Sequence, residues 1–194
     1  SASWHPGEII RDQYLLFPPL DAPIPSVLNI LVAVYDRSAD TRIGDTISGQ
    51  LSLTTKEPLL LPNTAIPINA TFGQAHLAGY DHLLDSDHLY LTLYWTSLAQ
   101  SLPDGTIFMH VFNAGGHYIL GSDSPPLNGA YPFSAWQPGE MVTHTHHLFY
   151  GDLVPGDYDV HIGVYNPETG ARWPIVDYAA NMPHDSSLFL HKLT

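Results

Sequence analysis

Two histidines at strand spacing could bind a metal ion. In His144-Thr-His-His147, the side chains of His144 and His146 fall on one face of a strand, because side chains alternate, and two imidazoles can hold Zn²⁺. The sequence shows no evident third ligand. A related segment near the N-terminus has Asp12 and Tyr14 at the equivalent positions. We therefore expect solvent-facing strand histidines and no metal site.

Acidic residues raise the possibility of calcium binding. Asp81, Asp85 and Asp87 form an acidic turn before a predicted strand. Ca²⁺ takes about six to eight oxygen ligands, and this spacing supplies neither that number nor an EF-hand loop. The sequence therefore predicts no calcium site here.

Hydrolytic chemistry has little support. A glycosidase needs two carboxyl groups at a set separation across a cleft. The glutamates of the chain are Glu8, Glu57, Glu140 and Glu168. No Ser-His-Asp or Cys-His arrangement has a recognisable setting. We expect no catalytic residue, no metal and no cofactor, and hence no enzyme.

A glycan site is suggested by the longest irregular stretch, residues 123–132. Loops on a rigid sheet are where binding usually resides. Aromatic faces stack on sugar C–H groups, and amides or carboxylates take the hydroxyls. The predicted lining of a shallow glycan-binding groove is Asp123, Asn128, Tyr131 and Trp136. The alternative is a proline-stiffened crossover between two sheets.

Charge and composition exclude several classes of partner. The 194 residues carry a net charge of −13 with only six Lys and Arg, so no basic patch is available for nucleic acid or for anionic lipid. There is no Cys, which excludes disulfides and thiolate metal sites. No apolar run approaches the roughly 20 residues of a membrane-spanning helix.

An internal repeat organises the chain. Trp4-His-Pro-Gly-Glu8 is matched by Trp136-Gln-Pro-Gly-Glu140, and Val34-Tyr-Asp36 by Val164-Tyr-Asn166. The second copy has a long lead-in, from about residue 66 to 135, that the first copy lacks. The sequence therefore predicts the second half of one repeat followed by one whole repeat.

The repeated Trp-x-Pro-Gly-Glu segment has two interpretations. Pro-Gly favours a type II turn, with the Trp buried and a strand following. Alternatively, the Trp stacks on a sugar while the Glu accepts hydrogen bonds from hydroxyls. We favour the architectural interpretation, because a turn present in both copies is what a repeated fold requires.

Period-two alternation predicts strands throughout. Leu89, Leu91, Leu93 and Trp95 share one face, and Tyr158 to Val164 alternates in the same way with Asp159 and His161 pointing outward. The predicted strands of the whole repeat are near 72–80, 88–98, 106–113, 117–123, 140–149, 157–165 and 187–193. Those of the partial repeat are near 8–17, 27–35 and 50–54.

The fold predicted from these strands is all-β. We expect an antiparallel two-sheet sandwich, immunoglobulin-like or jelly-roll-like, with one complete and one partial repeat. Residues 1–61 form the C-terminal part of the first repeat, residues 62–71 a linker, and residues 72–194 the complete repeat.

An ordered set of motifs resembles a known family. The motifs are Phe72-Gly73, Leu77-Ala-Gly-Tyr-Asp81, Leu91-Thr-Leu-Tyr-Trp95, Asp123-Ser-Pro-Pro-Leu-Asn-Gly-Ala-Tyr-Pro132, Trp136-Gln-Pro-Gly-Glu140, Pro155-Gly-Asp-Tyr158 and Gly163-Val-Tyr-Asn-Pro-Glu-Thr-Gly-Ala-Arg172. In that order they resemble the extracytoplasmic C-terminal β-sandwich repeats of bacterial polytopic membrane glycosyltransferases (the protein mannosyltransferase-like superfamily). The resemblance covers residues 66–194, and covers 1–61 as a repeat lacking its first four strands. The family's catalytic acids lie in its membrane portion, so none carries over.

The resemblance implies a function outside catalysis. The leading hypothesis is a non-catalytic accessory module on the outer side of a membrane, at the cell surface. Its partner would be the membrane-embedded portion of its parent protein, and it would contact glycan or acceptor. Two alternatives remain open: a free carbohydrate-binding module, and a structural protein that forms homo-oligomers or fibres through residues 1–61, whose strands lack partners.

Overall fold

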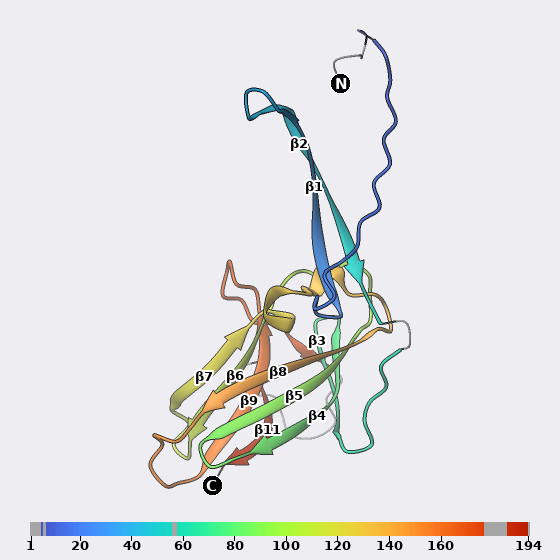
Figure 1. Ribbon diagram of the computed structural model, residues 1–194. Helices are drawn as coiled ribbons and strands as arrows, with labels where there is room; N and C mark the ends of the chain where they lie inside the picture. Colours follow the sequence, from blue (N-terminus) through green and yellow to red (C-terminus); the bar gives the residue numbers. More distant parts are fainter. Residues whose placement is uncertain (1–4, 6, 56–57, 177–185, 194) are drawn as a thin grey trace.

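The structure is a computed structural model and describes residues 5, 7–55, 58–176 and 186–193 (Figure 1). Trp4 lies outside the described residues, and so does the expected likeness between its surroundings and those of Trp136. The chain folds as an all-β sandwich of two antiparallel sheets from which a two-stranded hairpin projects. The predicted fold class is confirmed.

The first sheet has five strands in the order β10-β3-β4-β5-β8. Their bounds are β3 (Ile66–Phe72), β4 (Ala75–Leu84), β5 (His88–Ser97), β8 (Met141–Phe149) and β10 (Ile175–Val176). The strand predicted at 72–80 is wrong at its start, because Gly73 has a φ of +60° and turns the chain between β3 and β4. Most of the predicted linker, residues 66–71, lies in β3.

The second sheet has four strands in the order β11-β9-β6-β7. Their bounds are β6 (Thr106–Asn113), β7 (Tyr118–Ser124), β9 (Tyr158–Tyr165) and β11 (Leu188–Leu193). Between β7 and β8 run two short 3-10 helices, η1 (Pro126–Gly129) and η2 (Phe133–Ala135). None of the helices among the described residues is long and apolar enough to cross a membrane.

The core lies on the strand face that the alternating pattern predicted. Leu89, Leu91, Leu93 and Trp95 of β5 are fully buried. They face the second sheet, in which the inward residues of β6 and β9 are equally buried: Ile107, Met109, Val111, Val160, Ile162 and Val164. Each such side chain contributes about 1.5–3 kcal/mol on burial, which makes the contact between the sheets the main stabilising term.

The hairpin, called here the arm, consists of β1 (Ser26–Asp36) and β2 (Thr41–Leu53). It extends away from the sandwich and is anchored at its base by a hydrogen bond from the backbone N–H of Val27 to the carbonyl oxygen of Ala130, 2.8 Å long (Figure 1). β1 was predicted almost to the residue, whereas β2 is longer than the 50–54 expected.

The strand predicted at 8–17 does not form. This segment is the first copy's equivalent of β8, and β8 pairs only with β5. Within the described residues no second β5 exists to pair with it. Residues 8–17 therefore lie extended and exposed beside the arm, with Ile9 at 94% and Phe17 at 80% exposure.

The Gly-Glu part of the turn has the same geometry in both copies. Gly7 and Gly139 have φ values of +84° and +77°, as the third position of a type II turn requires. The N–H groups of Glu8 and Glu140 each donate to the carbonyl three residues earlier, at 3.0 Å. Their carboxylates accept from the N–H of that same earlier residue, also at 3.0 Å. This recurrence supports the architectural interpretation.

Gly163 provides a test of the packing between β9 and β6. A Cβ at this position would lie 2.3 Å from Cζ of Phe108, so Gly163→Ala forces the ring to move. We expect a loss of about 1–3 kcal/mol in the free energy of unfolding, measured with urea. Gly49→Ala is the matched control, because a Cβ there meets nothing within 4 Å. Equal stabilities of the two variants would contradict the prediction.

Candidate functional site

The two aromatic residues expected to stack on a glycan belong to the core. Tyr131 and Trp136 are both 0% exposed. The Nε1–H of Trp136 donates to the carbonyl oxygen of Tyr131 at 3.0 Å, and the Tyr131 hydroxyl donates to Oε2 of Glu140 at 2.9 Å. Burial and the Glu140 carboxylate raise the pKa of Tyr131. Neither ring can meet a sugar without leaving the interior.

The remaining two predicted residues are exposed. Asp123 lies in β7 and Asn128 in η1. The structure thus does not bring Asp123, Asn128, Tyr131 and Trp136 together in one open groove. The crossover interpretation of residues 123–132 agrees better with the packing, because this segment supplies Tyr131 to the core and Ala130 to the arm.

A different set of rings lies on the outer face of the second sheet. Tyr118 of β7, Phe112 of β6, His161 of β9 and Phe189 of β11 form a row, called here the ring row, with one ring from each strand. Successive ring centroids are 6.1, 5.2 and 5.8 Å apart. Tyr118 is 56% and Phe189 37% exposed, and the two central rings are half-buried.

Polar side chains stand beside the ring row. Phe112 and His161 line a cleft of about 430 Å³ together with Asn113, Asp159 and Arg172. The ring of His161 is fixed by a 3.2 Å hydrogen bond between its Nδ1 and the hydroxyl of Ser187. Amide, carboxylate and guanidinium groups therefore surround two aromatic rings, a combination suited to a polyhydroxylated ligand.

Glycines make room for the rings of β6. A Cβ on Gly121 would lie 2.7 Å from Cδ2 of His110, just as one on Gly163 would strike Phe108. The guanidinium carbon of Arg172 lies 4.8 Å from the centre of the Phe108 ring, a cation–π contact that holds the Arg172 side chain over the sheet. The absence of side chains at Gly121 and Gly163 thus leaves room for the rings of His110 and Phe108.

His110 and Asp123 form a pair next to the ring row. Nε2 of His110 lies 3.0 Å from Oδ1 of Asp123, and this nitrogen carries the hydrogen because the carboxylate can only accept. Burial lowers the pKa of His110, and the neighbouring carboxylate opposes that shift. Asp123 also accepts a hydrogen bond from Tyr165, whose pKa is raised chiefly by burial. Asp123 is thereby held in place on the outer face.

The sequence indicated the outward position of some residues of this site but not that they lie together. The outward positions of Asp159 and His161 follow from alternation. For residues 106–113, alternation separates Phe112 from Ile107, Met109 and Val111 but does not show which face meets the core, because both faces are apolar. The ring row also needs the register of four strands that are distant in sequence. Aromatic residues at outward positions of more than one strand were the available signal.

The prediction that His144 and His146 face solvent is wrong. They are 2% and 1% exposed and point into the sandwich on the same face of β8 as Val142 and Leu148. The two rings do lie together, with centroids 4.5 Å apart. They fill the open side of the sandwich between the edge strands β7 and β8.

Hydrogen bonds determine which ring nitrogen of His144 carries the hydrogen. The backbone N–H of Leu127 donates to its Nδ1 at 3.1 Å, so Nε2 carries the hydrogen and donates to Oγ of Ser124, also at 3.1 Å. For His146, Nδ1 lies 3.4 Å from Oγ of Ser122, and Nε2 has no hydrogen-bond partner among the described residues. The described residues place no third His, Asp or Glu ligand near the pair.

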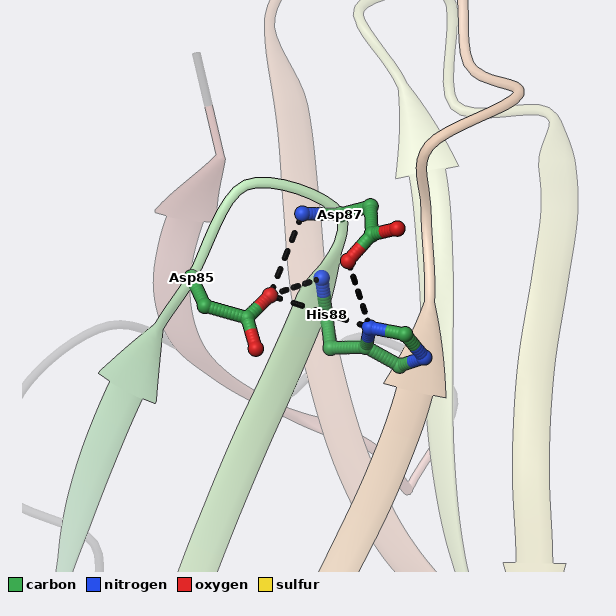
Figure 2. A group of neighbouring side chains, drawn as sticks. All are labelled: Asp85, Asp87 and His88. Atoms are coloured by element: carbon green, nitrogen blue, oxygen red, sulfur yellow. Dashed lines mark hydrogen bonds and ion pairs between the residues drawn. The ribbon is translucent and has the colours of Figure 1, made fainter.

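The acidic turn has a structural role. Asp85, Asp87 and His88 bring one ligand atom each within 4.8 Å of one another (Figure 2). However, Oδ1 of Asp85 accepts the backbone N–H groups of Asp87 and His88 at 3.1 and 2.8 Å, and these bonds lower the pKa of Asp85. Asp81 is engaged elsewhere, by the hydroxyl of Tyr94 at 2.8 Å. The carboxylate of Asp85 thus closes the β4–β5 turn.

Comparisons with known proteins identify no family. No family model matches the chain, and no curated protein matches its sequence. Among solved structures, the crystal structure of the C-terminal domain of Wzt aligns over 66% of this chain and 80% of that chain, with 19% sequence identity and a TM-score of 0.44. A likeness at this level carries no argument about function or ligand.

The buried histidines predict acid sensitivity. Burial lowers the pKa of His144 to about 4 and that of His146 to about 3, against 6.5 in the unfolded chain. Below pH 6.5 the unfolded state binds more protons, so stability present above pH 6.5 is lost as the pH falls toward the folded values. We expect a loss of about 2 kcal/mol per histidine between pH 7.5 and pH 5 in urea unfolding.

Two variants test whether His144 and His146 cause this loss of stability at low pH. His146→Leu removes one of the two buried titrating groups, so its stability depends less on pH than that of the wild type. His117→Leu, at an exposed turn position, serves as the control and retains the full dependence. An unchanged pH dependence in His146→Leu would show that other groups are responsible.

Proposed function

We propose that this protein is a non-catalytic β-sandwich module that binds glycan through the ring row and the adjoining cleft. The observation that carries the proposal is the row of four rings, one from each strand of the second sheet, with centroid spacings of 5.2 to 6.1 Å. These rings lie outside the contact between the two sheets, so core packing does not account for them.

The chemistry of the site suits an oligosaccharide. A sugar presents C–H groups that pack on aromatic faces and hydroxyls that both donate and accept hydrogen bonds. Successive rings of the row are nearly perpendicular, with interplanar angles of 76°, 74° and 72°, so the row offers ring faces and ring edges in turn. Tyr118, Phe112 and His161 supply these apolar contacts, while Asp159 accepts and Arg172 donates. Neighbouring rings are close enough to contact one extended oligosaccharide.

The non-catalytic part of the proposal is supported by what surrounds His110. A carboxylate-oriented imidazole is also part of a nucleophile-activating triad. Among the described residues, the only hydrogen bond of the His110 ring is to Asp123, and no hydroxyl is bonded to it. Since the sequence also contains no Cys, the pair lacks a nucleophile to activate.

The proposed setting is the outer side of a membrane. On the resemblance of its ordered motifs, the protein is an accessory module of a membrane glycosyltransferase-like protein, and its partner is the membrane-embedded portion of that parent. A module with the same ring row acting as a free carbohydrate-binding protein is the second candidate. Co-purification with a membrane glycosyltransferase of the same cell would favour the first.

Glycan binding is tested by removing the exposed ring and the acceptor beside it. We screen the wild type against a glycan array and measure the best ligand by calorimetry. Tyr118→Ala and Asp159→Ala are each expected to weaken binding about tenfold or more, equivalent to about 1.4 kcal/mol.

Phe149→Ala is the matched control, because Phe149 is similarly exposed, at 48%, but lies on edge strand β8 of the other sheet. It should bind like the wild type, and urea unfolding confirms that each variant folds. A wild type that binds no glycan, or binding that is indifferent to Tyr118 and Asp159, would refute the proposal.

A further inference from the structure

The arm presents an uncovered apolar surface. Val32 and Val34 of β1 are 53% and 55% exposed, and Ile43 and Ile47 of β2, which pair with them, are 55% and 71% exposed. Residues 26–35 and 46–53 contain no charged residue. Natural edge strands are usually protected by charge, proline or a covering element, so this surface is unusual for a strand facing only water.

The turn at the tip of the arm also occurs in the complete repeat. Oδ1 of Asp36 accepts the N–H groups of residues 38 and 39 at 2.8 and 3.2 Å. Oδ1 of Asn166 accepts those of residues 168 and 169 at 2.8 and 3.1 Å. Asp36 is the last residue of β1 and Asn166 directly follows β9, so β1 is the structural counterpart of β9.

Backbone pairing extends this equivalence. Tyr35 pairs antiparallel with Arg42, and Tyr165 pairs in the same way with Arg172. β2 then runs along β1 as β11 runs along β9. The partial repeat therefore reproduces the β9–β11 edge of the second sheet, with β2 in the place of β11.

The complete repeat shows what the free edge of β1 lacks. β9 has β11 on one side and β6 on the other, and β6 covers it with Ile107, Met109 and Val111 opposite Val164, Ile162 and Val160. β1 has β2 on the first side and, among the described residues, no strand on the second. The free edge of β1 is thus the position that a β6-type strand occupies.

We propose that the free edge of β1 binds an antiparallel strand of the β6 type, donated by the first half of another sandwich repeat. Such a strand is uncharged apart from histidine and places aliphatic side chains against Leu28, Ile30, Val32 and Val34. Backbone hydrogen bonds supply affinity and the alternating side chains supply specificity. The same donor would supply a β5-type partner for residues 8–17, the unpaired counterpart of β8.

Neither β6 of a second folded copy nor residues 16–19 of the same chain can pair with the free edge of β1. β6 of a folded copy is already paired on both edges, with β7 and β9, so a second intact copy cannot donate it. Residues 16–19 of the same chain lie beside residues 28–31, but Pro18 and Pro19 have no N–H to donate to an edge. The donor is therefore a repeat whose first half is unpaired.

A synthetic peptide with the sequence of residues 105–113 is the probe. We expect it to bind the full 194-residue chain with one-to-one stoichiometry, measured by calorimetry, and to slow hydrogen exchange of the amides in residues 28–34. Val32→Asp in the arm should weaken binding at least tenfold. Leu31→Asp is the matched control, because Leu31 is 70% exposed on the opposite face of the same strand.

The peptide has its own control, a version with Asp at the positions of Ile107, Met109 and Val111, which should not bind. Light scattering determines whether the chain is monomeric before peptide is added. Failure of the peptide to bind, or protection confined to another edge, would overturn the proposal. A dimer joined through β1 that excludes the peptide would also overturn it, since the occupant would then be the arm of a second copy.

Discussion

An unpaired strand edge leaves backbone N–H and C=O groups without partners, and an uncovered strand face leaves side chains open to water. In the sandwich, β5 is paired on both edges, with β4 and β8, and buries Leu89, Leu91, Leu93 and Trp95 against the second sheet. In the arm, β1 has one described partner strand and exposed apolar side chains. The outer face of the second sheet is intermediate, because its strands are paired with one another while its rings are partly open to solvent. Both candidate binding surfaces are places where coverage is incomplete.

Much of the fold could be predicted because alternation is a local signal. Period two alone separates the two faces of β5 and of β9. The same rule places His144 and His146 on the core face, since they share it with Val142 and Leu148. Their polarity, however, favoured a position facing solvent. The structure shows why alternation prevails: Ser122, Ser124 and the N–H of Leu127 lie opposite and provide hydrogen bonds to both rings. Those partners are 17 to 24 residues distant in sequence and were not visible in the pattern.

The candidate site was less predictable because it depends on which strands are neighbours. Tyr131 and Trp136 looked available for a glycan, but the sequence of a loop does not reveal which side of it meets the core. The ring row joins residues 112, 118, 161 and 189, and only the strand order β11-β9-β6-β7 makes them adjacent. Residues 8–17 form no strand for a similar reason. Strand-forming residues still need the edge of a neighbouring strand to pair with.

The partial repeat separates features that serve architecture from those that serve recognition. The Pro-Gly-Glu turn, the side-chain-capped turn at Asp36 or Asn166, and the pairing of a tyrosine with an arginine occur in both copies. Asp159 and His161 of the cleft do not, since Asn29 and Leu31 stand at the corresponding positions of the partial repeat. The proposed glycan site on the outer face is therefore confined to the complete repeat. The proposed strand addition uses the free edge of β1 in the other copy, so the two proposed activities can be lost separately.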